Sequence, residues 1–75
     1  MSKEKDLLTK LGNHIGKLAA TKFKSNVEFA NVCDLSETTI RRILQGKQNL
    51  SINVLKRICE ALNIKMSELL KDVGG

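Results

Sequence analysis

The stretch that decides the fold of this 75-residue chain is residues 25–47, which read SNVEFANVCDLSETTIRRILQGK. Ser25 is followed three positions later by Glu28, a capping box in which the serine hydroxyl accepts from the third helical amide and the glutamate returns to the Ser25 amide. The helix that begins at Ser25 must be short, because Ser36 is a good N-cap for the next helix. That next helix ends at Gly46, since glycine best fits a C′ position with positive φ. Two short helices joined by about three residues are the sequence form of a helix-turn-helix.

Apolar residues at helical spacing extend this pattern in both directions. A longer helix is expected from about Asp6 to Lys22, a fourth between Ser51 and Asn63, and a last one from about Met66 to Asp72. Residues 1–75 are therefore predicted to form one compact all-α, five-helix domain, with its core at about 6–72 and frayed ends. The side chains predicted to face inward are Leu8, Leu11, Ile15, Leu18 and Ala19; Phe29, Ala30 and Cys33; Ile40, Ile43 and Leu44; Ile52, Leu55, Ile58, Cys59 and Leu62; and Met66, Leu69 and Leu70. Val73 falls off the inward stripe of the last helix.

Composition agrees with this fold class and indicates the kind of partner. Hydrophobic residues make up 41% and charged residues 28%, the balance of a folded globular chain, and the absence of proline, tryptophan and tyrosine favours helices over strands. The formal net charge of +5 predicts a negatively charged partner, with nucleic acid ahead of an anionic membrane surface.

A wider set of residues carries a family resemblance. The set comprises Ser25, Asn26, Phe29, Ala30, Leu35, Ser36, Thr39, Ile40, Ile43, Gly46 and Lys47, preceded by Gly12, Ile15 and Leu18 and followed by Ser51, Leu55, Ile58, Ala61, Leu62 and Ile64. In these positions the chain resembles the phage-repressor and Cro-type (XRE-like) helix-turn-helix family over roughly residues 8–70. The resemblance implies a lambda-repressor-like fold and a transcriptional regulator that binds double-stranded DNA through a recognition helix at about 37–45.

Three positions depart from the family's pattern. Asp34 stands in the turn where the family usually has glycine, and the turn is expected to form because Asp tolerates a left-handed conformation at some cost. Ala19 and Leu44 stand where many members have an Arg–Glu ion pair, so we expect an apolar contact in its place, which need not lose stability. Asn26 stands where the family often has Gln, and its shorter amide is still expected to reach a phosphate.

The face of the recognition helix follows from helical geometry. The residues opposite its inward stripe are Thr38, Arg42 and Gln45, flanked by Glu37 and Arg41. In the major groove, Arg binds guanine O6 and N7, Thr contacts the thymine methyl and Glu accepts from cytosine N4. The resemblance assigns base reading mainly to Glu37, Thr38 and Arg42, and Arg41 is a fourth candidate. Glu37 would repel phosphates unless a base donor or Arg41 engages it, so it is predicted to select against wrong bases rather than to add affinity.

The resemblance also implies phosphate contacts around the amide end of the helix that starts at Ser25 and just after the recognition helix. The candidates are Lys24, Asn26, Thr39, Gln45 and Lys47, with Lys22 close enough in sequence to add charge.

Other chemistries find no support in the residues. Cys33 and Cys59 lack Cys-x-x-Cys spacing and His14 is the only histidine, so no zinc site, cofactor or small-molecule ligand is predicted. Both cysteines are expected to be packed thiols, and His14 a surface residue. The serines act as helix caps with no base beside them, so the chain is not expected to be an enzyme. No signal peptide or apolar span is found, which predicts a cytoplasmic protein with reduced thiols.

The size of the domain predicts a homodimer. One recognition helix contacts only a few base pairs. Two protomers related by two-fold symmetry gain affinity and specificity by binding two half-sites about 34 Å apart, which together form an inverted repeat. A patch of Leu69, Leu70 and Val73 is a candidate subunit contact; Val27 and Val32 fall off the inward stripes. The alternatives are a protein-interaction module that keeps the fold, for which Glu37 is the best support, and a membrane-surface binder. The operator sequence, the choice between activation and repression, and a phage, restriction-modification or antitoxin role stay open.

Overall fold

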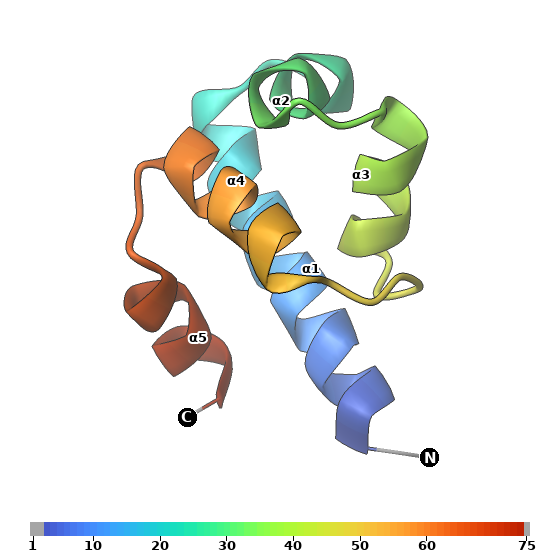
Figure 1. Ribbon diagram of the computed structural model, residues 1–75, viewed down its shortest axis with the longest axis vertical. Helices are drawn as coiled ribbons and strands as arrows, with labels where there is room; N and C mark the ends of the chain where they lie inside the picture. The colour runs from blue at the N-terminus through green and yellow to red at the C-terminus, as the bar shows by residue number, and fades with distance from the viewer. Residues whose placement is uncertain (1–2, 75) are drawn as a thin grey trace.

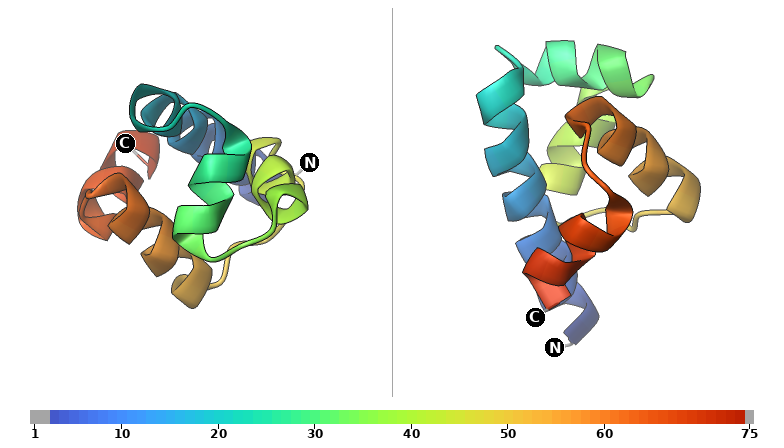
Figure 2. Two further views of the ribbon diagram at one scale, coloured as in Figure 1. Left: turned by 90° about the horizontal axis from the view of Figure 1, so that it is seen from above. Right: turned by 90° about the vertical axis from the view of Figure 1, so that its left-hand side faces the viewer.

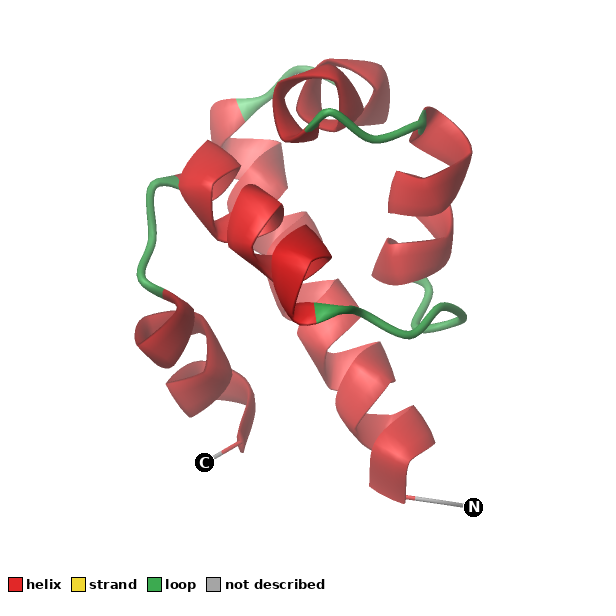
Figure 3. Cartoon of the chain, in the orientation of Figure 1, coloured by secondary structure: helices red, strands yellow, loops and turns green. Residues whose placement is uncertain are grey.

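The computed structural model describes residues 3–74, with side chains described for residues 7–71. Its elements are α1 (Lys3–Lys22), α2 (Asn26–Cys33), α3 (Glu37–Leu44), α4 (Ile52–Leu62) and α5 (Met66–Gly74). The described part contains helices and loops and no strand, as Figure 3 shows, which confirms the predicted all-α class. α1 begins at Lys3 rather than at the predicted Asp6, and α5 continues past the predicted Asp72 to Gly74. Within residues 3–74, no helix is long and apolar enough to span a bilayer.

α1 is the central helix, and the other helices are arranged around it (Figures 1 and 2). α2 crosses the C-terminal end of α1, α3 lies along one flank of it, and α5 lies on the other flank beside its N-terminal half. α4 packs against α1, α2 and α5 and closes the interior. The pair α2 and α3 is thus held from two sides, by α1 and by α4, with the outer surface of α3 left open.

Most of the predicted inward positions are confirmed. The fully buried ones are Leu11, Ile15, Ala19, Phe29, Ala30, Cys33, Ile40, Ile43, Leu55, Ile58, Cys59, Leu62 and Leu69, and Leu8, Leu18, Leu44 and Met66 are half-buried. All of these except Leu8 belong to one core between the helices. Val27 and Val32 are exposed, as their places off the stripes predict.

Three predictions of burial or exposure are wrong. Ile52 is 65% exposed because it is the first residue of α4, where the chain has only just left the polar loop. Leu70 is 42% exposed because the helical turn of about 100° from buried Leu69 carries it out of the core. His14 is half-buried rather than on the surface. α3, α4 and α5 all pack against α1, so they cover more of its circumference than the predicted apolar stripe. The side chain of Val73 lies outside the described residues.

The capping box at the start of α2 differs in one bond from the prediction. The Glu28 amide donates to Ser25 Oγ at 3.2 Å, as expected, but the Glu28 carboxylate accepts from the Lys24 amide at 2.7 Å rather than from the Ser25 amide. Ser25 is nearly fully extended (φ −154°, ψ 165°), which carries the preceding Lys24 amide over the first helical turn. The carboxylate therefore anchors the chain one residue earlier than a standard capping box does.

Candidate nucleic-acid interface

The turn between α2 and α3 has the geometry that a helix-turn-helix needs. Asp34 adopts a left-handed conformation (φ 61°, ψ 43°), which confirms that aspartate can stand in for the usual glycine. The Asp34 amide donates to the Asn31 carbonyl at 3.2 Å and the Leu35 amide to the Ala30 carbonyl at 2.9 Å, the two bonds of a Schellman motif. Arg57 of α4 donates from Nη1 to the Asp34 carbonyl at 3.4 Å. The turn is thereby tied to a helix outside the motif.

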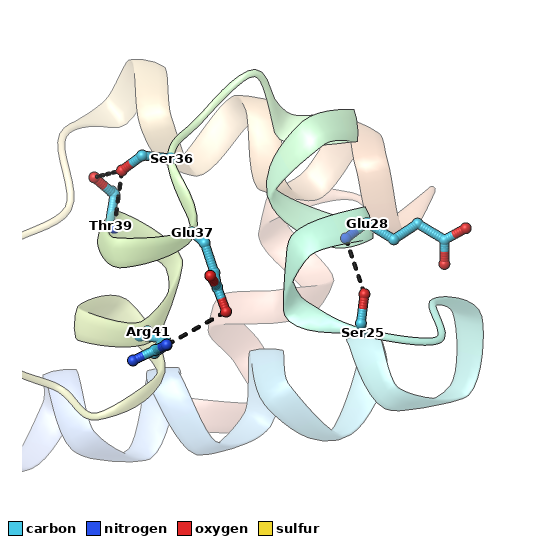
Figure 4. A network of polar contacts seen from close by, with 6 residues as sticks. All are labelled: Ser25, Glu28, Ser36, Glu37, Thr39 and Arg41. Atoms are coloured by element: carbon cyan, nitrogen blue, oxygen red, sulfur yellow. Dashed lines mark hydrogen bonds and ion pairs between the residues drawn. The ribbon is translucent and has the colours of Figure 1, made fainter.

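Both ends of α3 are defined by hydrogen bonds, and Figure 4 shows those at its start. Ser36 Oγ accepts from the Thr39 amide at 3.1 Å and donates to Thr39 Oγ1 at 2.9 Å. At the other end Gly46 adopts φ 72° and the Lys47 amide donates to the Arg42 carbonyl at 2.9 Å, so α3 stops at the predicted glycine. Capped at both ends, α3 is a short rod with a fixed length and direction.

Two glycines seat the C-terminal end of α3 directly on α1. A Cβ atom at Gly12 would lie 2.8 Å from the Leu44 carbonyl oxygen and closer still to the Ile43 carbonyl oxygen. A Cβ atom at Gly46 would lie 2.7 Å from Thr9 Cα. These are backbone-to-backbone contacts, so they set the position of α3 more rigidly than side-chain packing does. This role of Gly12 is not among the sequence-based expectations, although a glycine inside a strongly helical pattern is itself a signal of close packing.

The apolar contact expected between Ala19 and Leu44 stays a prediction, and the structure places Leu44 against α1 at Gly16. The Cδ2 atom of Leu44 lies in ordinary van der Waals range, 3.6 Å, of the place where a Gly16 Cβ would stand. Ala19, the partner named from the resemblance, is buried in the core. An apolar side chain therefore lies between α1 and α3, over Gly16 rather than at a charged pair.

The outward face of α3 carries polar side chains opposite two fully buried isoleucines. Ile40 and Ile43 are 0% and 1% exposed. Thr38, Arg41, Arg42 and Gln45 are exposed, and Glu37 and Thr39 are half-buried. Among the described residues, the Arg42 side chain makes no ion pair, whereas Arg41 Nε lies 3.4 Å from Glu37 Oε2 (Figure 4). The structure thus places Thr38 and Arg42 on the exposed face opposite the core, and on the neighbouring flank it engages Glu37 with Arg41, one of the two partners foreseen for it.

The predicted phosphate contacts occupy the ends of α2 and α3. Lys24 and Asn26 are exposed at the start of α2, where they line an open hollow of about 200 Å³ between α1 and α2. Lys22 is exposed at the end of α1. Gln45 and Lys47 are exposed just after α3. The amides at the start of α2 and the lysine charges are suited to anions.

Both cysteine thiols are buried in the core. Burial raises the pKa of the Cys33 thiol to about 11 and that of the Cys59 thiol in the same direction. Thiols with a raised pKa stay protonated and unreactive at neutral pH. No group of three or more histidine, cysteine, aspartate or glutamate side chains in the described part is arranged to hold a metal ion.

This chain is similar to known helix-turn-helix DNA-binding proteins in both sequence and structure. Residues 14–74 match the model of the Cro/C1-type HTH DNA-binding domain. Control protein C.MunI from a Mycoplasma species is 36% identical over 69 residues, which span 91% of this chain and 93% of that protein. The restriction-modification controller protein C.AhdI from Aeromonas hydrophila superposes with a TM-score of 0.78 at 26% identity, covering 85% of this chain and 96% of that one. The clp gene regulator ClgR from Corynebacterium glutamicum has the same fold, with a TM-score of 0.84 at 23% identity, covering 92% of this chain and 88% of that one.

Proposed function

This chain belongs to the Cro/C1-type helix-turn-helix DNA-binding family of transcription regulators, and we propose that it recognises a specific double-stranded sequence as a homodimer on an inverted repeat. The observation that carries the proposal is the open face of α3. Its accessible side chains Thr38 and Arg42 lie opposite the buried Ile40, and both ends of the helix are capped. An α-helix of this kind fits the major groove of B-DNA.

Each polar residue has a role in this proposal. Thr38 and Arg42 face the base edges, with Glu37 and Arg41 on the flank of α3. Lys24 and Asn26 hold one stretch of backbone at the start of α2, and Gln45 and Lys47 hold another after α3. Thr39 Oγ1 accepts from Ser36, which leaves its own proton free for a phosphate oxygen. The role places the protein in the cytoplasm, where it meets the DNA.

The homodimer rests on size and on one exposed side chain. A single α3 of eight residues contacts too few base pairs for operator specificity, and a two-fold mate doubles the contacts. Leu70 on α5 is 42% exposed and is a candidate subunit contact, whereas Leu69 is fully buried and is already used by the core. Sedimentation at micromolar concentration is expected to give twice the chain mass, and a monomer at all concentrations would contradict this part.

Selection from random duplex DNA tests the function as a whole. We expect an enriched inverted repeat whose half-sites are about one helical turn apart. Enrichment of a single half-site would contradict the homodimer alone. No enrichment would overturn sequence-specific binding and favour a protein-interaction module with this fold.

The similarity to C.MunI, a control protein, and C.AhdI, a restriction-modification controller, favours a controller role for this chain. Chromatin immunoprecipitation from the native host is expected to place its strongest sites beside restriction and methylation genes. Sites beside unrelated genes only would contradict that role while leaving DNA recognition intact.

Replacing Arg42 with alanine is expected to remove base preference at one symmetric pair of positions in the half-sites. Arg42 lies one turn after Thr38, is exposed and has no ion-pair partner among the described residues, so its fork is available to guanine O6 and N7. The loss at the preferred site is expected to be about 1–3 kcal/mol, with a much smaller loss on non-specific DNA. Selected-site profiles of wild type and Arg42→Ala measure this. An unchanged base preference with uniformly weaker binding would mean that Arg42 neutralises a phosphate.

Replacing Lys47 with alanine is expected to weaken binding to every duplex alike. Lys47 directly follows the capped end of α3, where its single positive charge can contact one phosphate of the DNA backbone. The slope of log affinity against log salt should fall by about two, one phosphate contact for each protomer. Lys56→Ala, at an exposed lysine on α4, is the matched control. A slope equal to that of the control would remove Lys47 from the phosphate contacts.

Replacing either cysteine with alanine is expected to leave DNA affinity near wild type in both reducing and oxidising buffer. Cys33 and Cys59 are buried and burial raises the pKa of both thiols, so they act as small packed side chains. Filter-binding or anisotropy titrations with and without a mild oxidant measure this. Binding lost on oxidation of the wild type and retained by either variant would reveal a redox switch instead.

A further inference from the structure

The Glu37 and Arg41 side chains form the only ion pair recorded on α3 among the described residues. Arg41 Nε donates to Glu37 Oε2 at 3.4 Å, with the side chains 61% and 41% exposed. Glu37 is the first residue of α3, where a carboxylate is also stabilised by the positive end of the helix dipole. The Glu37 carboxylate is therefore stabilised both by the ion pair with Arg41 and by the helix dipole. The carboxylate in turn orients the Arg41 guanidinium.

The pair lies on one flank of α3. Residues 37, 41 and 44 follow each other at helical spacing, and Leu44 lies over Gly16 of α1, so the exposed Glu37–Arg41 flank adjoins the edge of α3 that packs on α1. Figure 4 shows Glu37 on the side of α3 that looks toward the start of α2 at Ser25, with the Arg41 side chain one helical turn further along α3. Arg42, by contrast, lies on the face opposite the core. The side chains of the two neighbouring arginines thus leave α3 on different faces.

We infer that Glu37 and Arg41 form one recognition unit, in which Glu37 positions Arg41 and Arg41 reads one guanine of each half-site. This inference rests on the proposed function and revises the part that Glu37 plays in it. Nε is used by Glu37, and the two Nη groups remain free to donate side by side to O6 and N7 of guanine.

The negative charge of Glu37 decides which acceptor Arg41 takes. A phosphate beside Arg41 would meet the Glu37 carboxylate as well and be repelled, whereas guanine O6 and N7 are uncharged acceptors. An arginine already held in place also loses less side-chain freedom on binding. Glu37 thus directs Arg41 away from the backbone and toward a base.

The test compares Glu37→Gln, Arg41→Ala and the double variant by selected-site profile and by affinity for specific and random duplexes at one salt concentration. Both single variants are expected to lose preference at the same symmetric base pair, each by about tenfold, and the double variant by no more than about tenfold. Glu37→Gln should also bind random DNA more tightly, because Arg41 becomes free to contact phosphates.

Glu60→Gln is the matched control, because it removes the same charge from an exposed site on α4. Its selected-site profile should equal that of the wild type. Glu37→Gln with an unchanged profile, loss at a different base pair from Arg41→Ala, or multiplicative losses in the double variant would each overturn the inference. A wild type without any enriched site would instead overturn the proposed function before the variants are compared.

Discussion

Gly12→Ala is expected to abolish sequence-specific DNA binding by moving α3 off its seat on α1. The new Cβ would stand 2.8 Å from the Leu44 carbonyl oxygen and closer to that of Ile43, and neither is a side chain that can rotate away. The last turn of α3 must shift, and the hydrogen bonds that end it at Gly46 shift with it. Overpacking of this kind costs about 3 kcal/mol or more when backbone opposes it.

Gly16→Ala is a closely matched control for this prediction. Both glycines lie inside α1, so alanine brings each the same gain in helix propensity, about 0.5–1 kcal/mol. At Gly16 the new Cβ would meet only Leu44 Cδ2, at an ordinary 3.6 Å. Thermal unfolding should therefore place Gly16→Ala at or above the wild type and Gly12→Ala well below it. Equal stability of the two variants would show that α3 does not depend on contact with Gly12.

Ile40→Ala is expected to leave a large fraction of the protein unfolded at 37 °C. Ile40 is 0% exposed and is the innermost side chain of α3, so its truncation leaves a cavity in the core. Such substitutions cost about 2–5 kcal/mol. A domain of this size has a total free energy of unfolding of about 4–11 kcal/mol, so this loss is a large share of it. Urea denaturation followed by circular dichroism measures the change.

Ile52→Ala removes the same atoms from a side chain that is 65% exposed. Its free energy of unfolding is expected to change by no more than about 0.5 kcal/mol. This variant also tests the correction made by the structure, because the apolar stripe of α4 predicted Ile52 to be in the core. A loss at Ile52 comparable to the loss at Ile40 would mean that this side chain is covered after all, by the core or by a second protomer.

Local features were predictable because they depend on residues within one or two turns. The caps at Ser36 and Ser51, the left-handed Asp34, the end of α4 at Asn63 and the stop at Gly46 follow from the preferences of single residue types. The partner of Glu28 differed from the prediction because its flexible side chain can reach either of two adjacent amides.

By itself, the sequence determined the five helices, the helix-turn-helix and the outward face of α3, because the period of an α-helix places Thr38 and Arg42 opposite Ile40 whatever surrounds it. Only the tertiary structure decided the close contact of the α3 backbone with Gly12, the position of Leu44 over Gly16, and the exposure of Ile52 and Leu70. Periodicity identifies a face that can be buried. Whether it is buried, and against which backbone, depends on helices that are distant in the chain and meet only when it folds.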